Sequence, residues 1–264
     1  MKRLFLGQLL FPPKCAGCHE RLDALDSEFG SDQAFCRDCR SEWEKEKLNA
    51  CPGCRVAAVE CTCRPELLDK KYIDCISIVK FGRTQSADAL IYSLKRRKVA
   101  KNFEFASSEL AKRFKTYEKN TDRDLSDVIF TNVPRKRSSI AKFGFDHAKI
   151  LAEMTASALG LPYEELIMRV GSGKDQKKLT REQRSKNVKG NFELSIQGKL
   201  NEGTVVLVDD VVTTGSTAIE CIRVLREGGA KNIVLLSLSR TAEKKKARRK
   251  RLKGRKTQKK IDFR

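Results

Sequence analysis

Short apolar runs alternate with longer amphipathic stretches in the second and larger part of the chain. Continuous runs rich in β-branched residues predict four buried strands, at residues 73–81, 128–133, 204–208 and 232–238. Apolar residues at helical spacing predict four helices, at residues 87–94, 103–114, 146–159 and 216–226. Because strands that alternate with helices form largely parallel sheets with both faces covered, we predict an α/β domain over residues 72–240.

The first part of the chain does not share this pattern. Residues 1–14 resemble a signal peptide, but Gly7 and Gln8 interrupt the apolar run, and we predict a short amphipathic helix instead. Residues 15–63 have little hydrophobic periodicity and many cysteines, and the polar residues 64–71 connect them to the α/β domain. No stretch approaches the ~20 consecutive apolar residues of a membrane-spanning helix, so we expect no membrane span.

Eight of the ten cysteines lie within residues 15–63 and are closely paired in sequence. The pairs are Cys15 and Cys18, Cys36 and Cys39, Cys51 and Cys54, and Cys61 and Cys63. With no secretory signal we expect a reducing, cytoplasmic location, where disulfides are disfavoured. Two such pairs complete a tetrahedral zinc site, so we predict two structural Zn²⁺ ions, with an iron–sulfur cluster as the rival interpretation.

The spacing leaves the grouping of these ligands open. The simplest grouping is sequential, with the first four cysteines on one ion and the last four on the other, but a crossed grouping fits the spacing equally. Gly17, Gly53 and Asp38 stand just before the second cysteine of their pairs, where we expect a positive φ. Cys75 and Cys221 stand apart, and we predict that they are small core residues.

The most informative segment is residues 205–217, which reads VVLVDDVVTTGST. An apolar strand ends in Asp209 and Asp210, and a turn rich in hydroxyl groups then opens a helix. The helix N-terminus offers free backbone N–H groups and a partial positive charge, which suit a phosphate. Two adjacent carboxylates can accept hydrogen bonds from a pair of sugar hydroxyls. This segment therefore predicts a site for a phosphorylated sugar.

The segment resembles the motif with which type I phosphoribosyltransferases bind phosphoribosyl diphosphate (PRPP). The resemblance implies that Asp209 and Asp210 hold the ribose hydroxyls. It also implies that the 5′-phosphate is wrapped by Thr213, Thr214, Gly215, Ser216 and Thr217. These enzymes carry a diphosphate-binding loop after the second strand, where Arg135 and Lys136 stand here. The polar residues 171–190, which include Arg184, match the position of a mobile active-site loop.

Together with the cysteine pairs, this segment identifies the chain as resembling the ComF family of competence proteins, from about Leu9 to Leu238. The resemblance implies a type I phosphoribosyltransferase fold preceded by a double zinc ribbon, and a part in natural DNA uptake with other competence proteins. The family often shows Arg-Gly-Phe-Asn-Gln where this chain has Phe143, Asp146 and His147. His147 is interpreted either as a substrate donor or as a local partner of a neighbouring group.

By the same resemblance, a nucleophile would displace diphosphate from ribose with the help of Mg²⁺, and Asp209, Asp210 and Arg135 would have catalytic roles. The acceptor is not specified, and Thr213 stands where some purine-salvage relatives carry a carboxylate. The alternative is a non-catalytic module that binds PRPP or a nucleotide and handles single-stranded DNA. Release of diphosphate from PRPP distinguishes the two.

The formal charge of +21 is concentrated at the C-terminus. Residues 240–264 hold 14 Lys and Arg against two acidic residues, a net charge of +12. We predict a disordered or frayed basic tail over residues 241–264, which either binds nucleic acid or keeps the protein dispersed. The chain is thus predicted to consist of a zinc module at 1–66, a phosphoribosyltransferase domain at 72–240 and this tail.

Overall fold

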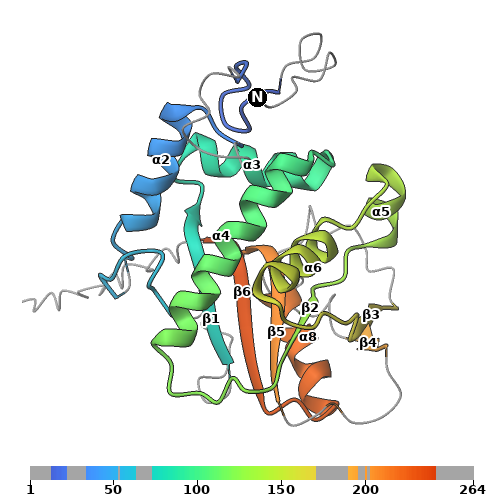
Figure 1. Ribbon diagram of the computed structural model, residues 1–264. Helices are drawn as coiled ribbons and strands as arrows, with labels where there is room; N and C mark the ends of the chain where they lie inside the picture. Colours follow the sequence, from blue (N-terminus) through green and yellow to red (C-terminus); the bar gives the residue numbers. More distant parts are fainter. Residues whose placement is uncertain are drawn as a thin grey trace, which may run out of the picture.

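The computed structural model of the protein describes residues 13–22, 34–52, 54–63, 73–170, 190–195, 200 and 203–241 (Figure 1). Its centre is a four-stranded sheet in the order β1-β6-β5-β2, and all of its strand pairs are parallel. The strands are β1 (Ile73–Phe81), β2 (Val128–Asn132), β5 (Thr204–Val212) and β6 (Asn232–Thr241). All four predicted strands are confirmed, and β5 and β6 extend further than the apolar runs indicated.

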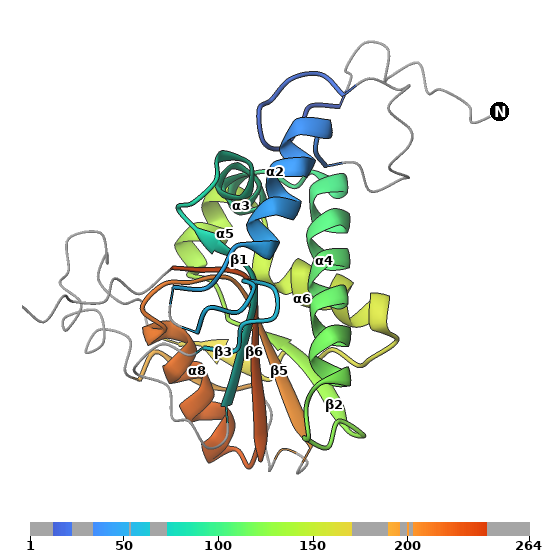
Figure 2. The ribbon, with the colours of Figure 1, turned by 90° about the vertical axis from the view of Figure 1, so that its left-hand side faces the viewer.

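Helices cover both faces of this sheet, as the alternation of elements predicted. On one face lie α4 (Ala100–Lys119) and α6 (His147–Leu159), and on the other lies α8 (Ser216–Glu227) (Figure 2). The helix α3 (Gln85–Arg96) follows β1, and several of its buried residues belong to the same apolar cluster as those of α4. Each face has its own apolar cluster, so the strands between them are buried on both sides. The four predicted helices are confirmed, with ends that differ by a few residues.

The helix α6 shows why its ends could be predicted. The carboxylate of Asp146 accepts hydrogen bonds from the backbone N–H groups of Ala148 and Lys149, which caps the start of the helix. Gly160 ends the helix with a left-handed φ of 69°, a conformation that costs glycine little.

The cysteine-rich region packs against this domain through a helix that the sequence pattern did not predict. This helix, α2 (Arg37–Leu48), is dominated by charged residues and buries Trp43 completely. The indole ring lies against Phe35 and Phe105 and shares the apolar cluster of β1, α3 and α4. A single large aromatic residue therefore attaches α2, which is why helical periodicity gave no signal.

Three further elements were not predicted: α5 (Arg137–Phe143), β3 (Ile167–Arg169) and β4 (Phe192–Leu194), of which β3 and β4 form an antiparallel pair. Each has seven residues or fewer, too few to establish a hydrophobic period. Several predictions lie outside the described residues: nearly all of the N-terminal helix, the connector, the polar loop with Arg184, and the basic tail. None of the described helices has both the length and the apolar character that crossing a membrane requires.

Candidate functional site

The turn after β5 has the geometry of an anion-binding helix start. Gly215 lies between the end of β5 and the first residue of α8 and has a left-handed φ of 76°. A side chain at this position would be strained, whereas glycine adopts the conformation freely. The 12-residue helix α8 then begins at Ser216, and its first backbone N–H groups have no partner within the helix.

Hydroxyl groups gather in the same turn. Thr214 Oγ1 lies 2.9 Å from Ser216 Oγ and accepts a hydrogen bond from the backbone N–H of Ser216 at 3.4 Å. The hydroxyl of Thr241, at the end of β6, donates to the carbonyl oxygen of Thr213 at 3.0 Å. Thr213 itself is exposed, and Thr217 is half-buried in the first turn of α8. The predicted phosphate residues therefore form one continuous turn at the carboxyl edge of the sheet.

The two carboxylates that precede this turn have different surroundings. Asp210 is only 4% exposed, and its Oδ2 lies 2.6 Å from His147 Nε2 and 3.1 Å from Lys95 Nζ. Asp209 is half-buried, and its Oδ1 accepts a hydrogen bond from the backbone N–H of Asp210. The two carboxylates therefore have different nearest partners, although the charge of Lys95 acts on both.

These surroundings shift the pKa values of the two carboxyl groups in opposite directions. Burial opposes ionisation of Asp210, but the charge of Lys95 and the hydrogen bond with His147 outweigh it and hold its pKa below the ordinary value. Burial and the neighbouring charge of Asp210 raise the pKa of Asp209 well above its ordinary value. Asp210 is therefore a fixed anion. Of the two carboxyl groups, Asp209 is the one whose ionised form would be stabilised more by a cation or hydrogen-bond donor supplied by a ligand.

The loop after β2 lies next to this acidic pair. One Nη of Arg135 donates to the carbonyl oxygen of Lys95 at 2.9 Å, and the other donates to that of Phe145 at 3.3 Å. The guanidinium also lies 4.9 Å from the ring centroid of Phe143. The backbone N–H of Arg135 donates to Asp146, the residue that caps α6. Arg135 thus connects α3, the β2–α5 loop and the start of α6, while Lys136 directly precedes α5.

Four cysteines form the first candidate metal group: Cys15, Cys18, Cys36 and Cys39. Their sulfur atoms all lie within 4.8 Å of one another, and Cys18 Sγ is 3.7 Å from Cys36 Sγ. A tetrahedral zinc site with Zn–S distances of about 2.3 Å has sulfur atoms about 3.8 Å apart, so the group fits a zinc ion. Backbone N–H groups of Gly17 and Cys36 donate to Cys15 Sγ, each at 3.3 Å.

The second candidate metal group consists of Cys51, Cys54, Cys61 and Cys63, again with all sulfur atoms within 4.8 Å. The sequential grouping is therefore the one that the structure brings together. Arg240, at the end of β6, donates through Nη2 to Cys61 Sγ at 2.6 Å and to Cys51 Sγ at 3.7 Å. The expectation that Cys75 and Cys221 are core residues is confirmed, since both are completely buried.

The expected role of the knuckle glycines is corrected. Gly17 does not have a positive φ; that conformation falls on His19 and Arg55, directly after the second cysteine of their pairs. Gly17 is needed for space instead, because a Cβ there would lie 2.6 Å from Cys39 Sγ. Asp38 is part of α2, so the expectation of a positive φ was wrong there also, and Gly53 lies outside the described residues.

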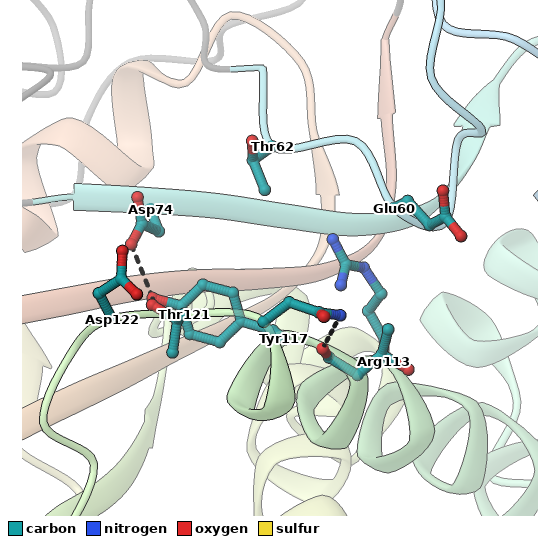
Figure 3. Close-up of a pocket in the computed structure, with 9 residues that line it drawn as sticks. Glu60, Thr62, Asp74, Arg113, Tyr117, Thr121 and Asp122 are labelled. Atoms are coloured by element: carbon teal, nitrogen blue, oxygen red, sulfur yellow. Dashed lines mark hydrogen bonds between the residues drawn. The ribbon is translucent and has the colours of Figure 1, made fainter.

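A separate hollow of about 250 Å³ lies where the second cysteine group meets the sheet domain (Figure 3). Glu60 and Thr62 line it from the cysteine segment, and Asp74 lines it from the start of β1. The hydroxyl of Tyr117 donates to Asp74 Oδ2 at 2.6 Å, and Arg123 makes an ion pair with the same oxygen. The hollow lies at the amino end of β1, away from the phosphate turn, and the side chains of Asp74, Tyr117 and Thr121 that line it form hydrogen bonds with one another.

The structure thus brings together most of the residues that the sequence predicted for the sugar-phosphate site. It adds Lys95, which sequence reasoning missed because it lies on α3, far from the motif in sequence. Of the two interpretations of His147, its contact with Asp210 matches that of a local partner. Arg184 lies outside the described residues.

Comparison with known proteins agrees with this geometry. The family model for the phosphoribosyl transferase domain matches residues 147–263. DNA utilization protein YhgH of Salmonella typhimurium is 34% identical over 126 residues, which are 47% of this chain and 53% of that protein. Competence protein ComFC of Streptococcus pneumoniae is 24% identical over 216 residues, which are 79% of this chain and 89% of that protein. The chain thus spans about half the length of the first relative and most of the second.

A third relative, competence protein F of Haemophilus influenzae, is 32% identical over 99 residues, which are 37% of this chain and 43% of that protein. Among solved structures, a purine phosphoribosyltransferase of Pyrococcus horikoshii is 21% identical, with a TM-score of 0.32. That match covers 53% of this chain and 83% of the other chain.

Proposed function

Since the chain belongs to the ComF family and carries a phosphoribosyltransferase domain, we propose that it binds PRPP together with Mg²⁺ at the carboxyl edge of its sheet. The observation that carries the proposal is the acidic pair at the end of β5, followed at once by a glycine-capped helix start. The turn from Thr213 to Thr217 would hold the 5′-phosphate, and Asp209 and Asp210 would accept hydrogen bonds from the ribose hydroxyls.

The diphosphate of PRPP would extend toward the loop after β2, which neighbours β5 in the sheet. Lys136 and Arg135 are the predicted cationic residues there, and Arg184 would approach from the polar loop. When bound, Mg²⁺ would offset the charge of the diphosphate and ribose oxygens. Asp209 and Asp210 would place negative charge beside a cation-like transition state, and the basic residues would stabilise the departing diphosphate.

We also propose that each cysteine group holds one Zn²⁺ with a structural role. Each group offers four sulfur ligands, which leaves no open position for a substrate. The ions would fix the cysteine segments on α3, α4 and the edge strand β1. A place in natural DNA uptake, alongside other competence proteins, is the biological setting that we propose for the chain.

A non-catalytic module that binds PRPP or a nucleotide and handles single-stranded DNA is the second candidate. The observation that favours it is the basic C-terminal segment, which holds 12 Lys and Arg in residues 242–260. Phosphate contacts by such a segment do not require any reaction at the sugar site.

Two measurements on the full-length, zinc-loaded protein test the proposal. Titration calorimetry with PRPP, with and without Mg²⁺, should show binding that requires the ion. Diphosphate release should then be followed in a screen of bases, nucleosides and amines. Release with one acceptor supports a transferase, and binding without release supports the second candidate. No PRPP binding in the presence of Mg²⁺ contradicts both the site and the function.

A further inference from the structure

Lys95 contacts both halves of the proposed site. Its ammonium group lies 3.1 Å from Asp210 Oδ2, at the end of β5. Its backbone carbonyl accepts a hydrogen bond from Arg135, in the loop after β2. If the ribose lies at the acidic pair and the diphosphate lies toward the β2 loop, Lys95 stands between the two.

Lys95 and Arg135 do not have equivalent surroundings. The guanidinium of Arg135 is held by two backbone carbonyls and by the ring of Phe143, so it fixes the positions of the surrounding segments. The side chain of Lys95 is 33% exposed, and Asp210 is the anionic partner that the structure gives it. Lys95 is therefore the cation whose charge reaches both the acidic pair and the solvent.

Asp210 does not depend on Lys95 alone. His147 Nε2 lies 2.6 Å from the same carboxylate oxygen, and the side chains of His147 and Asp210 are 8% and 6% exposed. If Lys95 turned toward an incoming anion, Asp210 would keep a buried hydrogen-bond partner. A buried carboxylate without any partner would be costly, so His147 makes this exchange possible.

We propose that Lys95 binds the diphosphate group of PRPP. When the ligand enters, the ammonium group of Lys95 moves from Asp210 to the diphosphate oxygens. His147 is a positioning residue that keeps Asp210 oriented during this exchange. Lysine suits the role because its ammonium group is a compact charge on a flexible stem. This inference rests on the proposed function, since it assigns a residue to part of the same site.

The test compares two probes that differ only in the diphosphate, PRPP and ribose 5-phosphate, each titrated with Mg²⁺ by calorimetry. Lys95→Met is expected to weaken binding of PRPP at least tenfold and to change binding of ribose 5-phosphate less than threefold, as expected for one lost charge-assisted contact. Lys95→Arg should retain most of the PRPP affinity. Lys115→Met, on the exposed surface of α4, is the matched control and should bind both probes as the wild type does.

The His147 variants test the positioning role. His147→Ala should weaken the binding of both probes, because Asp210 then loses its buried partner. His147→Gln retains an N–H donor and should therefore keep most of the binding. Equal weakening of both probes by Lys95→Met, or no change with either, overturns the assignment of Lys95. If the wild type binds neither probe, both the proposed function and this inference are wrong. If the wild type binds PRPP and Lys95→Met binds it with the same affinity, only the inference is wrong.

Discussion

Arg240 Nη2 lies 2.6 Å from Cys61 Sγ, so the end of strand β6 contacts a candidate metal ligand almost 180 positions earlier in the chain. Lys80 is the register partner of Arg240 on β1, and both residues are buried. Arg113, also buried, donates to the carbonyl oxygen of Cys61. Buried cations are costly without an anion, and a four-thiolate zinc site carries a net charge of −2. The second group therefore fits the sheet best in its metal-loaded form.

This contact predicts that Arg240 retains zinc in the second group. Arg240→Met should leave zinc in the first group but accelerate its release from the second, because a charged hydrogen bond contributes about 1.5–3 kcal/mol, or at least a tenfold effect. Elemental analysis should find about two zinc ions per wild-type chain, by the four-thiolate rule. Release to a chromogenic chelator should separate into two phases, of which the variant changes one.

Arg223→Met is the matched control, since it removes an arginine from the exposed surface of α8 without touching a cysteine. It should release zinc as the wild type does. Equal release from Arg240→Met and Arg223→Met contradicts the coupling. Iron with a visible absorbance, or no metal, in protein purified without chelators contradicts the zinc assignment itself.

The acidic pair gives a second prediction, in which the two single variants differ. Asp209→Asn should weaken PRPP binding with little change in thermal stability, because among the described residues the carboxylate of Asp209 accepts a hydrogen bond from a backbone N–H and forms no side-chain ion pair. Asp210→Asn should lower both the affinity for PRPP and the thermal stability, because Lys95 and His147 lose their shared anion. The double variant should weaken binding at least tenfold, the loss expected for charge-assisted hydrogen bonds. Unchanged affinity in the double variant would move the proposed site elsewhere.

Much of this site could be predicted because its parts are consecutive in sequence. The end of β5, the turn and the start of α8 form one local motif, and local backbone chemistry is sufficient to predict it. Lys95 and Arg240 belong to other elements, and only the three-dimensional arrangement brings them to Asp210 and Cys61. No period or spacing in the sequence marks either residue.

The errors have the same physical origin. Gly17 was expected to adopt a positive φ, whereas the structure needs its small size beside Cys39. That requirement comes from a second segment, which a local pattern does not contain. The helix α2 was missed because Trp43 alone supplies most of its buried apolar surface, so no amphipathic period appears.

Glu109 predicts how stability depends on pH. It is 2% exposed, and burial opposes its ionisation, but hydrogen bonds from Lys47, Trp43 and Lys112 outweigh burial and lower its pKa from 4.5 to about 2. A lowered pKa contributes stability that is fully present above the unfolded value and is lost as the pH falls toward the folded value. The free energy of unfolding should therefore fall by about 3 kcal/mol between pH 5 and 2 through this one group.

Glu109→Gln should lower stability at pH 7 and flatten this acid dependence, because the amide cannot ionise. Glu104→Gln, on the exposed part of α4, should leave both quantities near wild type. Urea unfolding at several pH values measures them directly. An acid dependence that is equally steep in the wild type and in Glu109→Gln would assign the loss of stability to other carboxylates.

The basic C-terminal segment gives the last prediction, which concerns nucleic acid. Deleting residues 242–264 removes 13 Lys and Arg and two acidic residues, and it leaves the phosphate turn untouched. We expect the truncated protein to lose most of its affinity for single-stranded DNA while binding PRPP as before. The contact should show little preference for sequence, because Phe263 is the one aromatic residue after Phe192 and base stacking needs aromatic side chains.

Salt dependence distinguishes this interpretation from a segment that only keeps the protein dispersed. Each phosphate contact to a single strand releases counterions, so about six contacts would give a slope near −4 for the logarithm of affinity against the logarithm of salt concentration. Fluorescence anisotropy with a labelled oligonucleotide, at several salt concentrations, measures this slope for both proteins. The deletion should reduce the slope as well as the affinity. Equal slopes and affinities in the full-length and truncated proteins would place any DNA contact on the cysteine module or the sheet domain.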